Sequence, residues 1–198
     1  MKITLEFLPT VVFVIVMLCW FVFAGIFIFR KQPTGAPDRK RDRGSIVGVA
    51  LQGLAYAIVW SVRRQPFTPL AAGDHWLEVL TAAIAIAASI GSVVLIMSAV
   101  KTLGKEWSIT ARMVQDHQLA TKGPYARVRH PIYTGMLGML IATGLAISHW
   151  IALVAAMVIF AIGTLIRVRI EERLLREMFG QRFEEYARQV PAVIPGIF

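Results

Sequence analysis

Two polar segments of this sequence stand beside apolar runs and carry residue types suited to a catalytic site. The first, "GPYARVRHPIYTG" (123–135), places arginines, tyrosines and a histidine just before an apolar run. The second, "RVRIEERLLREMFG" (167–180), begins where another apolar run ends and holds two adjacent glutamates. Ionisable groups this close to hydrocarbon are costly and usually have a task. The two segments therefore predict a site for a charged small molecule at a membrane edge.

Pro131 predicts that a helix starts within the first segment. Proline suits the first helical turn because its missing N–H needs no partner there, which makes His130 the N-cap. The free N–H groups of that turn and the helix dipole can hold an anion or a carboxylate. The alternative is an interfacial anchor, with arginines on lipid head groups and tyrosines in the aromatic belt.

The second segment contains the acid pair Glu171 and Glu172. Adjacent residues on a helix point about 100° apart, so the two carboxylates are expected to have different roles. Arg167–Glu171 and Glu172–Arg176 have i,i+4 spacing. A salt-bridged surface helix would show the same spacing, and that alternative stays open here.

Together the two segments supply carboxylates, a helix start, aromatic rings and arginines. Carboxylates can bind an ammonium group or ribose hydroxyls, and aromatic rings can face a sulfonium cation. S-adenosylmethionine carries all the complementary groups and is one candidate ligand among several. The sequence has no P-loop, no GxGxxG after a strand and no HExxH, and its four histidines lack ligand spacing. No metal site is expected.

The composition indicates an integral membrane protein. Of the 198 residues, 57% are hydrophobic and 17% are charged, and the mean hydropathy is +0.63. The net charge of +9 could indicate nucleic-acid binding. Most lysines and arginines instead stand beside apolar runs, as the positive-inside rule predicts, so we expect a lipid bilayer and no nucleic acid as partner. A single cysteine, Cys19, excludes a disulfide within the chain.

We expect one domain over residues 1–198, an all-α bundle of five transmembrane helices with a cytoplasmic C-terminal helix. The five apolar runs are residues 7–29, 45–62, 77–100, 131–148 and 151–166. Residues 1–100 would form a three-helix membrane part, and residues 101–198 the cofactor-binding and catalytic part. The first run is too long for a signal-peptide core and is expected to be retained.

The basic segments predict the orientation of the chain. They place residues 30–44, 101–130 and the C-terminal tail in the cytoplasm, and the N-terminus outside. Arg63 and Arg64 fall on the outer side and are an exception. The fourth and fifth runs share a turn of two or three residues, so they must form an antiparallel hairpin. Both polar segments then meet at its open, cytoplasmic end.

At this point the residues are similar to a known family. "HQLATKGPYARVRHPIYTG" (117–135), followed by the apolar hairpin and "RVRIEERLLREMFGQRFEEYARQVPAVIPGI" (167–197), resembles the isoprenylcysteine carboxyl methyltransferases. These are integral membrane enzymes that use S-adenosylmethionine. The related phospholipid N-methyltransferases carry a GxG signature that this sequence lacks, which favours the carboxyl methyltransferase branch.

The resemblance implies transfer of a methyl group from S-adenosylmethionine to the carboxylate of a lipidic or prenylcysteine-like acceptor at the membrane–cytoplasm boundary. Arg167 and Glu172 would be catalytic, with Arg167 holding the acceptor carboxylate and Glu172 fixing Arg167 or the cofactor amine. The implied cofactor-binding residues are Gln118, Leu119, Gly123, Tyr125, His130, Pro131, Tyr133 and Glu171.

Two alternatives remain at this stage. The chain could be a phospholipid or other small-molecule N- or O-methyltransferase, or a non-catalytic lipid-binding membrane protein. The lean loops indicate a prokaryotic member, in a bacterial or archaeal plasma membrane. The acceptor would contact the first three apolar runs, which match no motif.

Overall fold

The fold is helical, as expected, with one short β-ribbon. The computed structural model describes residues 6–29, 38–41, 44–65, 67–68, 74–104, 112–114 and 119–196. Within this part of the chain the elements are α1 (Phe7–Phe29), β1 (Asp38–Arg41), α2 (Ser45–Ser61), α3 (His75–Leu103), β2 (Arg112–Val114), the 3₁₀ turn η2 (Gly123–Ala126), α4 (Pro131–Ile147), α5 (Trp150–Phe179) and α6 (Gln181–Gln189).

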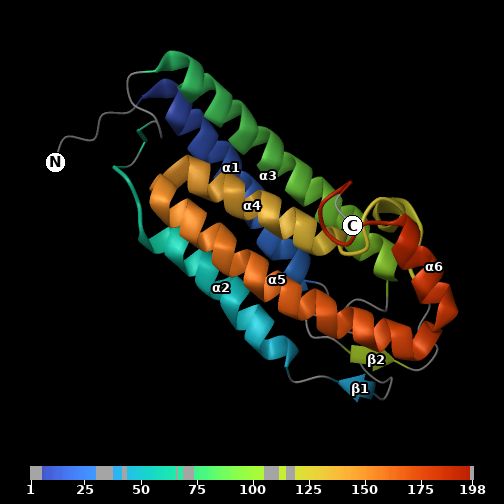
Figure 1. The fold of residues 1–198 in the computed structure, drawn as a ribbon. Coiled ribbons are helices and arrows are strands. Elements are labelled where there is room, and N and C mark those ends of the chain that lie inside the picture. Colours follow the sequence, from blue (N-terminus) through green and yellow to red (C-terminus); the bar gives the residue numbers. More distant parts are fainter. Residues whose placement is uncertain are drawn as a thin grey trace.

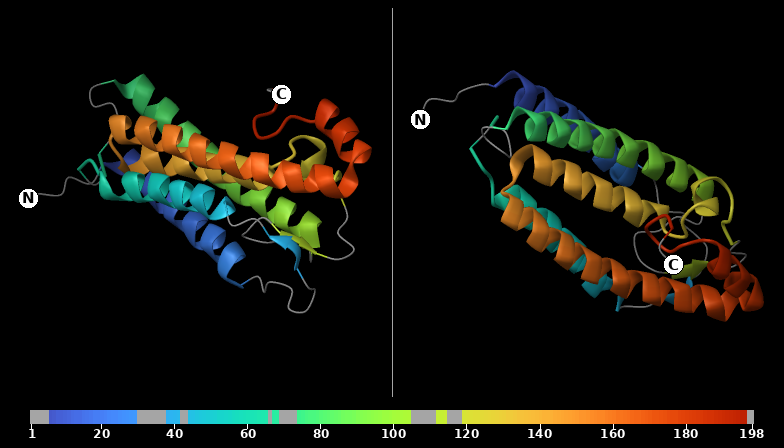
Figure 2. Two further views of the ribbon diagram at one scale, coloured as in Figure 1. Left: turned by 60° about the horizontal axis from the view of Figure 1, so that its bottom comes forward. Right: turned by 45° about the horizontal axis from the view of Figure 1, so that its top comes forward.

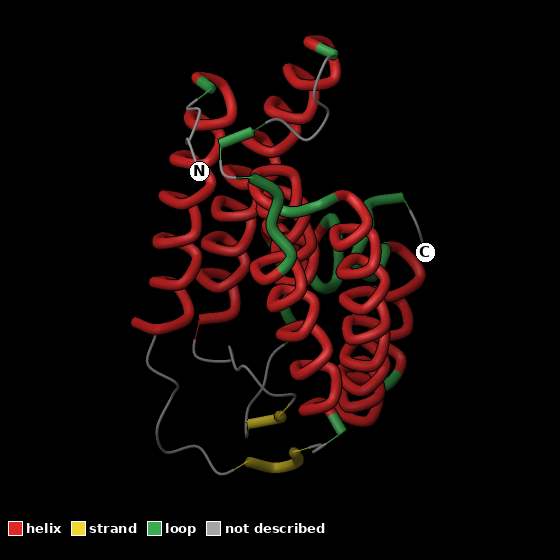
Figure 3. Tube along the Cα trace, turned by 90° about the vertical axis from the view of Figure 1, so that its left-hand side faces the viewer, coloured by secondary structure: helices red, strands yellow, loops and turns green. Residues whose placement is uncertain are grey.

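The ribbon joins two polar segments whose pairing could not be predicted from the sequence. β1 and β2 are antiparallel, with Asp38 opposite Val114 and Arg41 opposite Arg112. They are the two yellow segments of the tube in Figure 3. The first strand lies in the proline- and glycine-containing basic segment, where no strand was expected. Such a pairing depends on distant segments meeting, which local sequence patterns do not reveal.

Three helices, α1, α3 and α5, are long and apolar enough to cross a membrane. α2 and α4 are apolar but shorter, at 17 residues each. A helix of that length rises about 26 Å, slightly less than the hydrocarbon core of about 30 Å. The protein is therefore an integral membrane protein.

The helices form an elongated bundle (Figure 1). α3 packs chiefly on α4 and α2 packs chiefly on α5, while α1 lies against α3 and α4. The two views of Figure 2 show α4 and α5 as the antiparallel hairpin that their short connection predicted. The start of α1 and the α4–α5 turn lie at one end of the bundle, and α6 lies with the start of α4 at the other. We call these the Arg64 end and the His130 end.

Helix α5 differs from the expected fifth span. The apolar run was expected to end near residue 166, with a separate C-terminal helix after it. Instead α5 continues without interruption through the polar segment to Phe179. The break comes at Gly180, whose φ of 53° is a left-handed conformation that glycine adopts readily. The second acidic and basic segment is thus a direct extension of the hairpin.

Glycines allow the helices to pack closely. A Cβ on Gly135 of α4 would lie 2.5 Å from the Ile96 side chain of α3, and a Cβ on Gly163 of α5 would lie 2.8 Å from the Gly48 carbonyl oxygen of α2. Neither contact leaves room for a larger residue. In a membrane, where lipid competes equally for apolar surface, such close packing is a main source of helix association.

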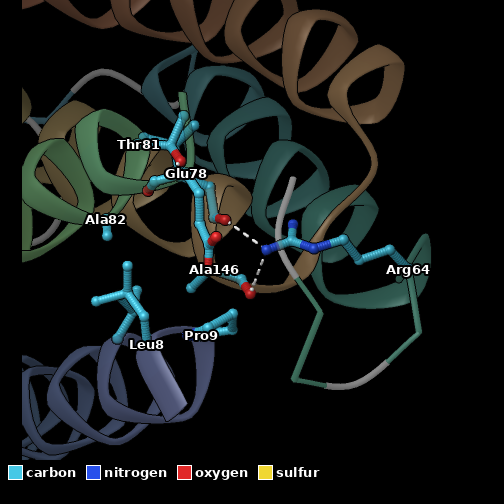
Figure 4. Close-up of a pocket in the computed structure, with 9 residues that line it drawn as sticks. Leu8, Pro9, Arg64, Glu78, Thr81, Ala82 and Ala146 are labelled. Carbon is cyan, nitrogen blue, oxygen red and sulfur yellow. Dashed lines mark hydrogen bonds between the residues drawn. The ribbon is translucent and has the colours of Figure 1, made fainter. Parts of the chain in front are cut away.

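Arg64, one of the two arginines that depart from the positive-inside rule, caps the C-terminal end of α4. Its guanidinium donates to the carbonyl oxygens of Ser148 (2.7 Å), Leu145 (2.7 Å) and Ala146 (2.8 Å), as Figure 4 shows in part. The last carbonyl groups of a helix have no partner within it, and a cation there also complements the helix dipole. Burial lowers the pKa of Arg64 to about 10.

A small pocket lies beside Arg64, between the starts of α1 and α3 and the end of α4 (Figure 4). Its lining residues are Leu8, Pro9, Val12, Arg64, Glu78, Thr81, Ala82, Leu145 and Ala146. The pocket is at the end of the bundle away from His130. It therefore has no part in the site that the sequence predicts.

Candidate active site

Helix α4 begins as predicted, with Pro131 as its first residue and His130 as its N-cap. The C-terminal segment holds this junction in place. The backbone N–H of Arg129 donates to the Pro191 carbonyl oxygen, and that of His130 donates to the Ala192 carbonyl oxygen, both at 2.8 Å. The tail after α6 thus fixes the backbone at the start of α4.

His130 lies between the two acids of α5. Its Nδ1 is 3.3 Å from Glu171 Oε2, and its Nε2 is 3.4 Å from Glu172 Oε1. The ring is buried and stacks on Tyr133, with centroids 5.6 Å apart. Burial alone would lower the pKa of His130, but its hydrogen bonds to Glu171 and Glu172 and their charges raise it. The acids, expected to act separately, meet at opposite edges of one imidazole.

Glu172 is enclosed by positive groups. Its Oε1 lies 2.8 Å from Arg129 Nε, and its Oε2 lies 3.2 Å from Arg176 Nη2. Arg176 in turn contacts Glu184 of α6 at 2.8 Å. The side chain of Glu172 is 8% exposed, whereas that of Glu171 is 23% exposed. Glu171 is therefore the more accessible of the two carboxylates.

Arg167 lies one turn before the acids on α5 and is buried. Its Nη2 is 3.3 Å from Glu171 Oε1, and its guanidinium carbon lies 4.9 Å from the centroid of the Tyr133 ring. The Tyr133 hydroxyl also donates to Glu171. On the opposite side, Arg167 Nη1 donates to Gln52 Oε1 of α2 at 3.4 Å. Arg167 is thus a buried arginine at the point where the apolar part of α5 ends and its polar part begins.

The structure brings together five of the predicted site residues: His130, Tyr133, Arg167, Glu171 and Glu172. Pro131, the sixth, is buried directly beside His130. The carboxylate that contacts Arg167 is Glu171, and Glu172 lies among Arg129, His130 and Arg176.

The remaining predicted residues lie in or before η2. Tyr125 is buried, its carbonyl oxygen accepts from the Tyr186 hydroxyl at 2.6 Å, and burial and the Glu171 charge raise its pKa. Gly123 opens the turn with a φ of 62° and is exposed. Leu119 is half-buried. Gln118 lies outside the described residues.

Sequence reasoning missed two side chains of this site, Arg129 and Gln52. Arg129 is one of the arginines of the first polar segment that were expected to add positive charge at the helix start, but it was not named among the site residues. Gln52 is an amide in the middle of an apolar run. Polar groups inside membrane helices usually have a partner or a function, so its position alone could have marked it.

Comparison with known proteins supports a methyltransferase site. The family model of the phospholipid methyltransferases matches residues 80–182, from α3 into α6. The chain belongs to the phospholipid methyltransferase family. The match includes both polar segments, and it leaves out α1 and α2.

Several curated proteins that resemble the chain are named as isoprenylcysteine methyltransferases. Protein-S-isoprenylcysteine O-methyltransferase B of Arabidopsis thaliana is 32% identical over 100 residues, which are 50% of this chain and 51% of the relative. The cobalt-zinc-cadmium resistance protein CzcN of Cupriavidus metallidurans is 36% identical over 102 residues, 48% of this chain and 44% of the relative. The chain spans about half the length of the curated relatives it matches.

A solved structure shares the fold. The eukaryotic intramembrane Ras methyltransferase ICMT, an isoprenylcysteine carboxyl methyltransferase, superimposes with a TM-score of 0.55 and 27% identity. The match covers 77% of this chain and 52% of the solved chain. The resemblance that the sequence motifs carried is thus confirmed by sequence and by fold.

Proposed function

We propose that this protein transfers a methyl group from S-adenosylmethionine to the carboxylate of a lipidic, prenylcysteine-like acceptor at the membrane–cytoplasm boundary. The observation that carries the proposal is the convergence of His130, Glu171 and Arg167 at the open end of the α4–α5 hairpin. The family and the named relatives support the reaction class.

Arg167 is the residue proposed to bind the acceptor. Its planar guanidinium matches a carboxylate, and its position at the end of the apolar part of α5 suits an acceptor with a lipid tail. A carboxylate is already ionised at neutral pH, so it needs no general base. Arg167 would direct one carboxylate oxygen toward the methyl group that bound S-adenosylmethionine would supply, and no residue here would have to accept a proton. The residues here have mainly to align the groups and exclude water.

The polar and aromatic groups around His130 fit S-adenosylmethionine, the proposed source of the methyl group. S-adenosylmethionine, when bound, supplies a methyl group activated by a sulfonium. Glu171, the more exposed of the two acids, can accept hydrogen bonds from ribose hydroxyls or an ammonium group. The Tyr133 ring packs against His130 and lies under the Arg167 guanidinium, so it would keep both groups in place beside the cofactor. Leu119, Gly123 and Tyr125 would complete this side from η2 and the segment before it, together with Gln118.

Glu172 is proposed to shape the site rather than to touch the acceptor. Both of its oxygens are engaged, by Arg129 and His130 on one side and by Arg176 on the other. Through these contacts it ties the start of α4 to α5. Its role in catalysis would be to hold His130 where the ligand meets it.

The proposal includes the arrangement in the membrane. All five apolar helices would cross, with the shorter α2 and α4 surrounded by longer neighbours, and the chain would act as one unit over residues 1–198. The His130 end would face the cytoplasm of a bacterial or archaeal cell, and the N-terminus would lie outside. The abundant arginines of the His130 end support this orientation.

Replacement of Arg167 by lysine tests the function. Lysine keeps the charge but cannot offer two parallel donors to a carboxylate. We expect Arg167→Lys to lower kcat/KM for a prenylated cysteine by about 100-fold. Methyl transfer would be followed with a labelled donor in detergent. Thermal stabilisation by S-adenosylhomocysteine would report whether the cofactor side is intact, since a bound ligand raises the midpoint.

The matched control is Glu185→Gln, on exposed α6, where Glu185 bonds only to Gln181 among the contacts described. This variant should keep its activity. Wild-type rates in Arg167→Lys would remove Arg167 from the acceptor site. Absence of stabilisation by S-adenosylhomocysteine in the wild type would instead favour the non-catalytic, lipid-binding alternative.

A phospholipid head-group amine is the second candidate acceptor, and the description of the matching family favours it. Such an acceptor brings a cation to the site and would not suit the buried guanidinium of Arg167. Mass spectrometry of lipids from expressing membranes separates the two. Methylated amine head groups would support the second candidate, and methyl esters the first.

A further inference from the structure

The Arg167 side chain is held from α2 as well as from α4 and α5. The Arg167 Nη1 donates to Gln52 Oε1, and Gln52 Nε2 donates to Thr164 Oγ1 at 2.9 Å. Gln52 is 2% exposed. It lies outside residues 80–182, which the family shares. An element that the family match does not include therefore reaches the centre of the proposed site.

The orientation of the Gln52 amide follows from its partners. A guanidinium has only donors, so the amide must turn its oxygen toward Arg167. The NH₂ group then faces Thr164, whose hydroxyl can accept. A buried amide that lacks such partners is costly. The two contacts therefore hold Gln52 in one position, and Gln52 in turn fixes one edge of the guanidinium.

The aliphatic part of Arg167 is fixed by the backbone of α2. A Cβ on Gly48 would lie 2.4 Å from Arg167 Cγ and 2.7 Å from the Gly163 carbonyl oxygen. The aliphatic part of the Arg167 side chain thus packs directly on the backbone of α2, because Gly48 has no side chain. With the Tyr133 ring on one face of the guanidinium and Gln52 at its edge, the plane of the group is restrained.

We propose that Gln52 is a positioning residue for Arg167, and that it fixes the direction in which the guanidinium meets the acceptor carboxylate. This inference rests on the proposed function, in which Arg167 binds the acceptor. A neutral amide suits this task, because it restrains the group without neutralising it. Glu171 already occupies the other terminal nitrogen, and a second carboxylate at position 52 would compete with the acceptor for the same charge.

Two substitutions at position 52 test the proposal, with an S-prenylated, N-acetylated cysteine as acceptor. Gln52→Met keeps the size but removes both hydrogen bonds, and we expect kcat/KM for the acceptor to fall about tenfold. Gln52→Glu can still accept a hydrogen bond from Arg167, but its negative charge offsets the positive charge of the guanidinium. We therefore expect the acceptor KM to rise more than tenfold. The concentration dependence of thermal stabilisation by S-adenosylhomocysteine should stay within about twofold of wild type in both.

The matched control is Tyr56→Phe, one turn along the same helix. It removes a buried hydrogen bond from the Tyr56 hydroxyl to the Met136 carbonyl oxygen, at 2.7 Å, without touching Arg167. It should lower the thermal midpoint and leave the acceptor kinetics unchanged. An equal loss of acceptor kcat/KM in Tyr56→Phe would assign the effect to general loosening of α2 and overturn the proposal.

Two further outcomes separate this inference from the proposed function. If Arg167→Lys is impaired while both Gln52 variants keep wild-type acceptor kinetics, Gln52 has no positioning role and the proposed function stands. If Arg167→Lys is as active as wild type, the acceptor site itself is misplaced, and the Gln52 inference is overturned with it.

Discussion

His130 contacts both Glu171 and Glu172, although adjacent side chains on a helix point in different directions. It can do so because an imidazole has a nitrogen at each edge, and both nitrogens donate when the ring is protonated. The carboxylates raise its pKa, although burial opposes this. When it is protonated, the ring places a positive charge between Glu171 and Glu172, whose charges would otherwise repel each other.

This arrangement predicts a pH-dependent stability. The folded-state pKa of His130 lies above the value of about 6.5 in an unfolded chain. Its contribution is therefore complete below pH 6.5 and is lost as the pH rises through the folded-state pKa. We expect the thermal midpoint in detergent to fall as the pH rises above 6.5, and His130→Gln to remove much of this fall.

The control for that measurement is His149→Gln. His149 is exposed at the Arg64 end of the bundle, where its ring accepts from the Ile151 backbone N–H. Its replacement should leave the pH profile as it is in the wild type. A profile that is the same in His130→Gln and wild type would contradict a protonated His130.

At the scale of elements, Arg64 joins the loop after α2 to the end of α4. Three backbone carbonyl oxygens at that end accept from its guanidinium, and a fourth bond runs from Arg64 Nε to the Thr68 carbonyl oxygen at 2.8 Å. The contact caps the C-terminal end of α4 and joins it to the loop after α2. The contacts of Arg64 thus give its positive charge at this end of the bundle a structural reason.

Loss of this contact should destabilise the protein. We expect Arg64→Gln to lower the free energy of unfolding by about 3 kcal/mol, because carbonyl groups lose a charged donor. That corresponds to a fall in the thermal midpoint of about 6–12 °C. Arg63→Gln is the matched control, since Arg63 is exposed and has the same charge. Equal falls in the two variants would show that charge, and not the capping of α4, is responsible.

At the scale of the whole molecule, both functional segments lie at one end of the bundle. α3 separates the loop that holds Gln65 from the segment that holds Lys122, and both residues are exposed. The positive-inside rule predicts that Lys122 lies in the cytoplasm. A soluble donor would then reach the His130 end from the cytoplasm, while a lipidic acceptor reaches Arg167 from the bilayer.

Cysteine labelling tests this orientation. In a Cys19→Ala background, an impermeant maleimide should label Gln65→Cys in intact cells and Lys122→Cys only after permeabilisation. The opposite pattern would reverse the orientation. Labelling of both positions from the same side would show that α3 does not cross the membrane.

Much of the site was predictable because its signals are local. Pro131 marks a helix start through its missing N–H, the short link between two apolar runs requires a hairpin, and the hairpin brings His130 to the acids of α5. The contribution of α2 was not predictable in this way. Gln52 and Arg167 are separated by 115 residues, and no pattern in either segment states that the two helices pack together.

The sequence by itself determined the membrane character, the family and the two segments that form the site, because apolar run lengths and motif spacing depend on neighbouring residues. Only the tertiary structure decided the partners within the site. Which acid contacts Arg167, how His130 spans both carboxylates and why α2 reaches the guanidinium depend on glycine-mediated helix contacts and side-chain directions. Those are set by packing in three dimensions, and residues far apart in the chain determine them jointly.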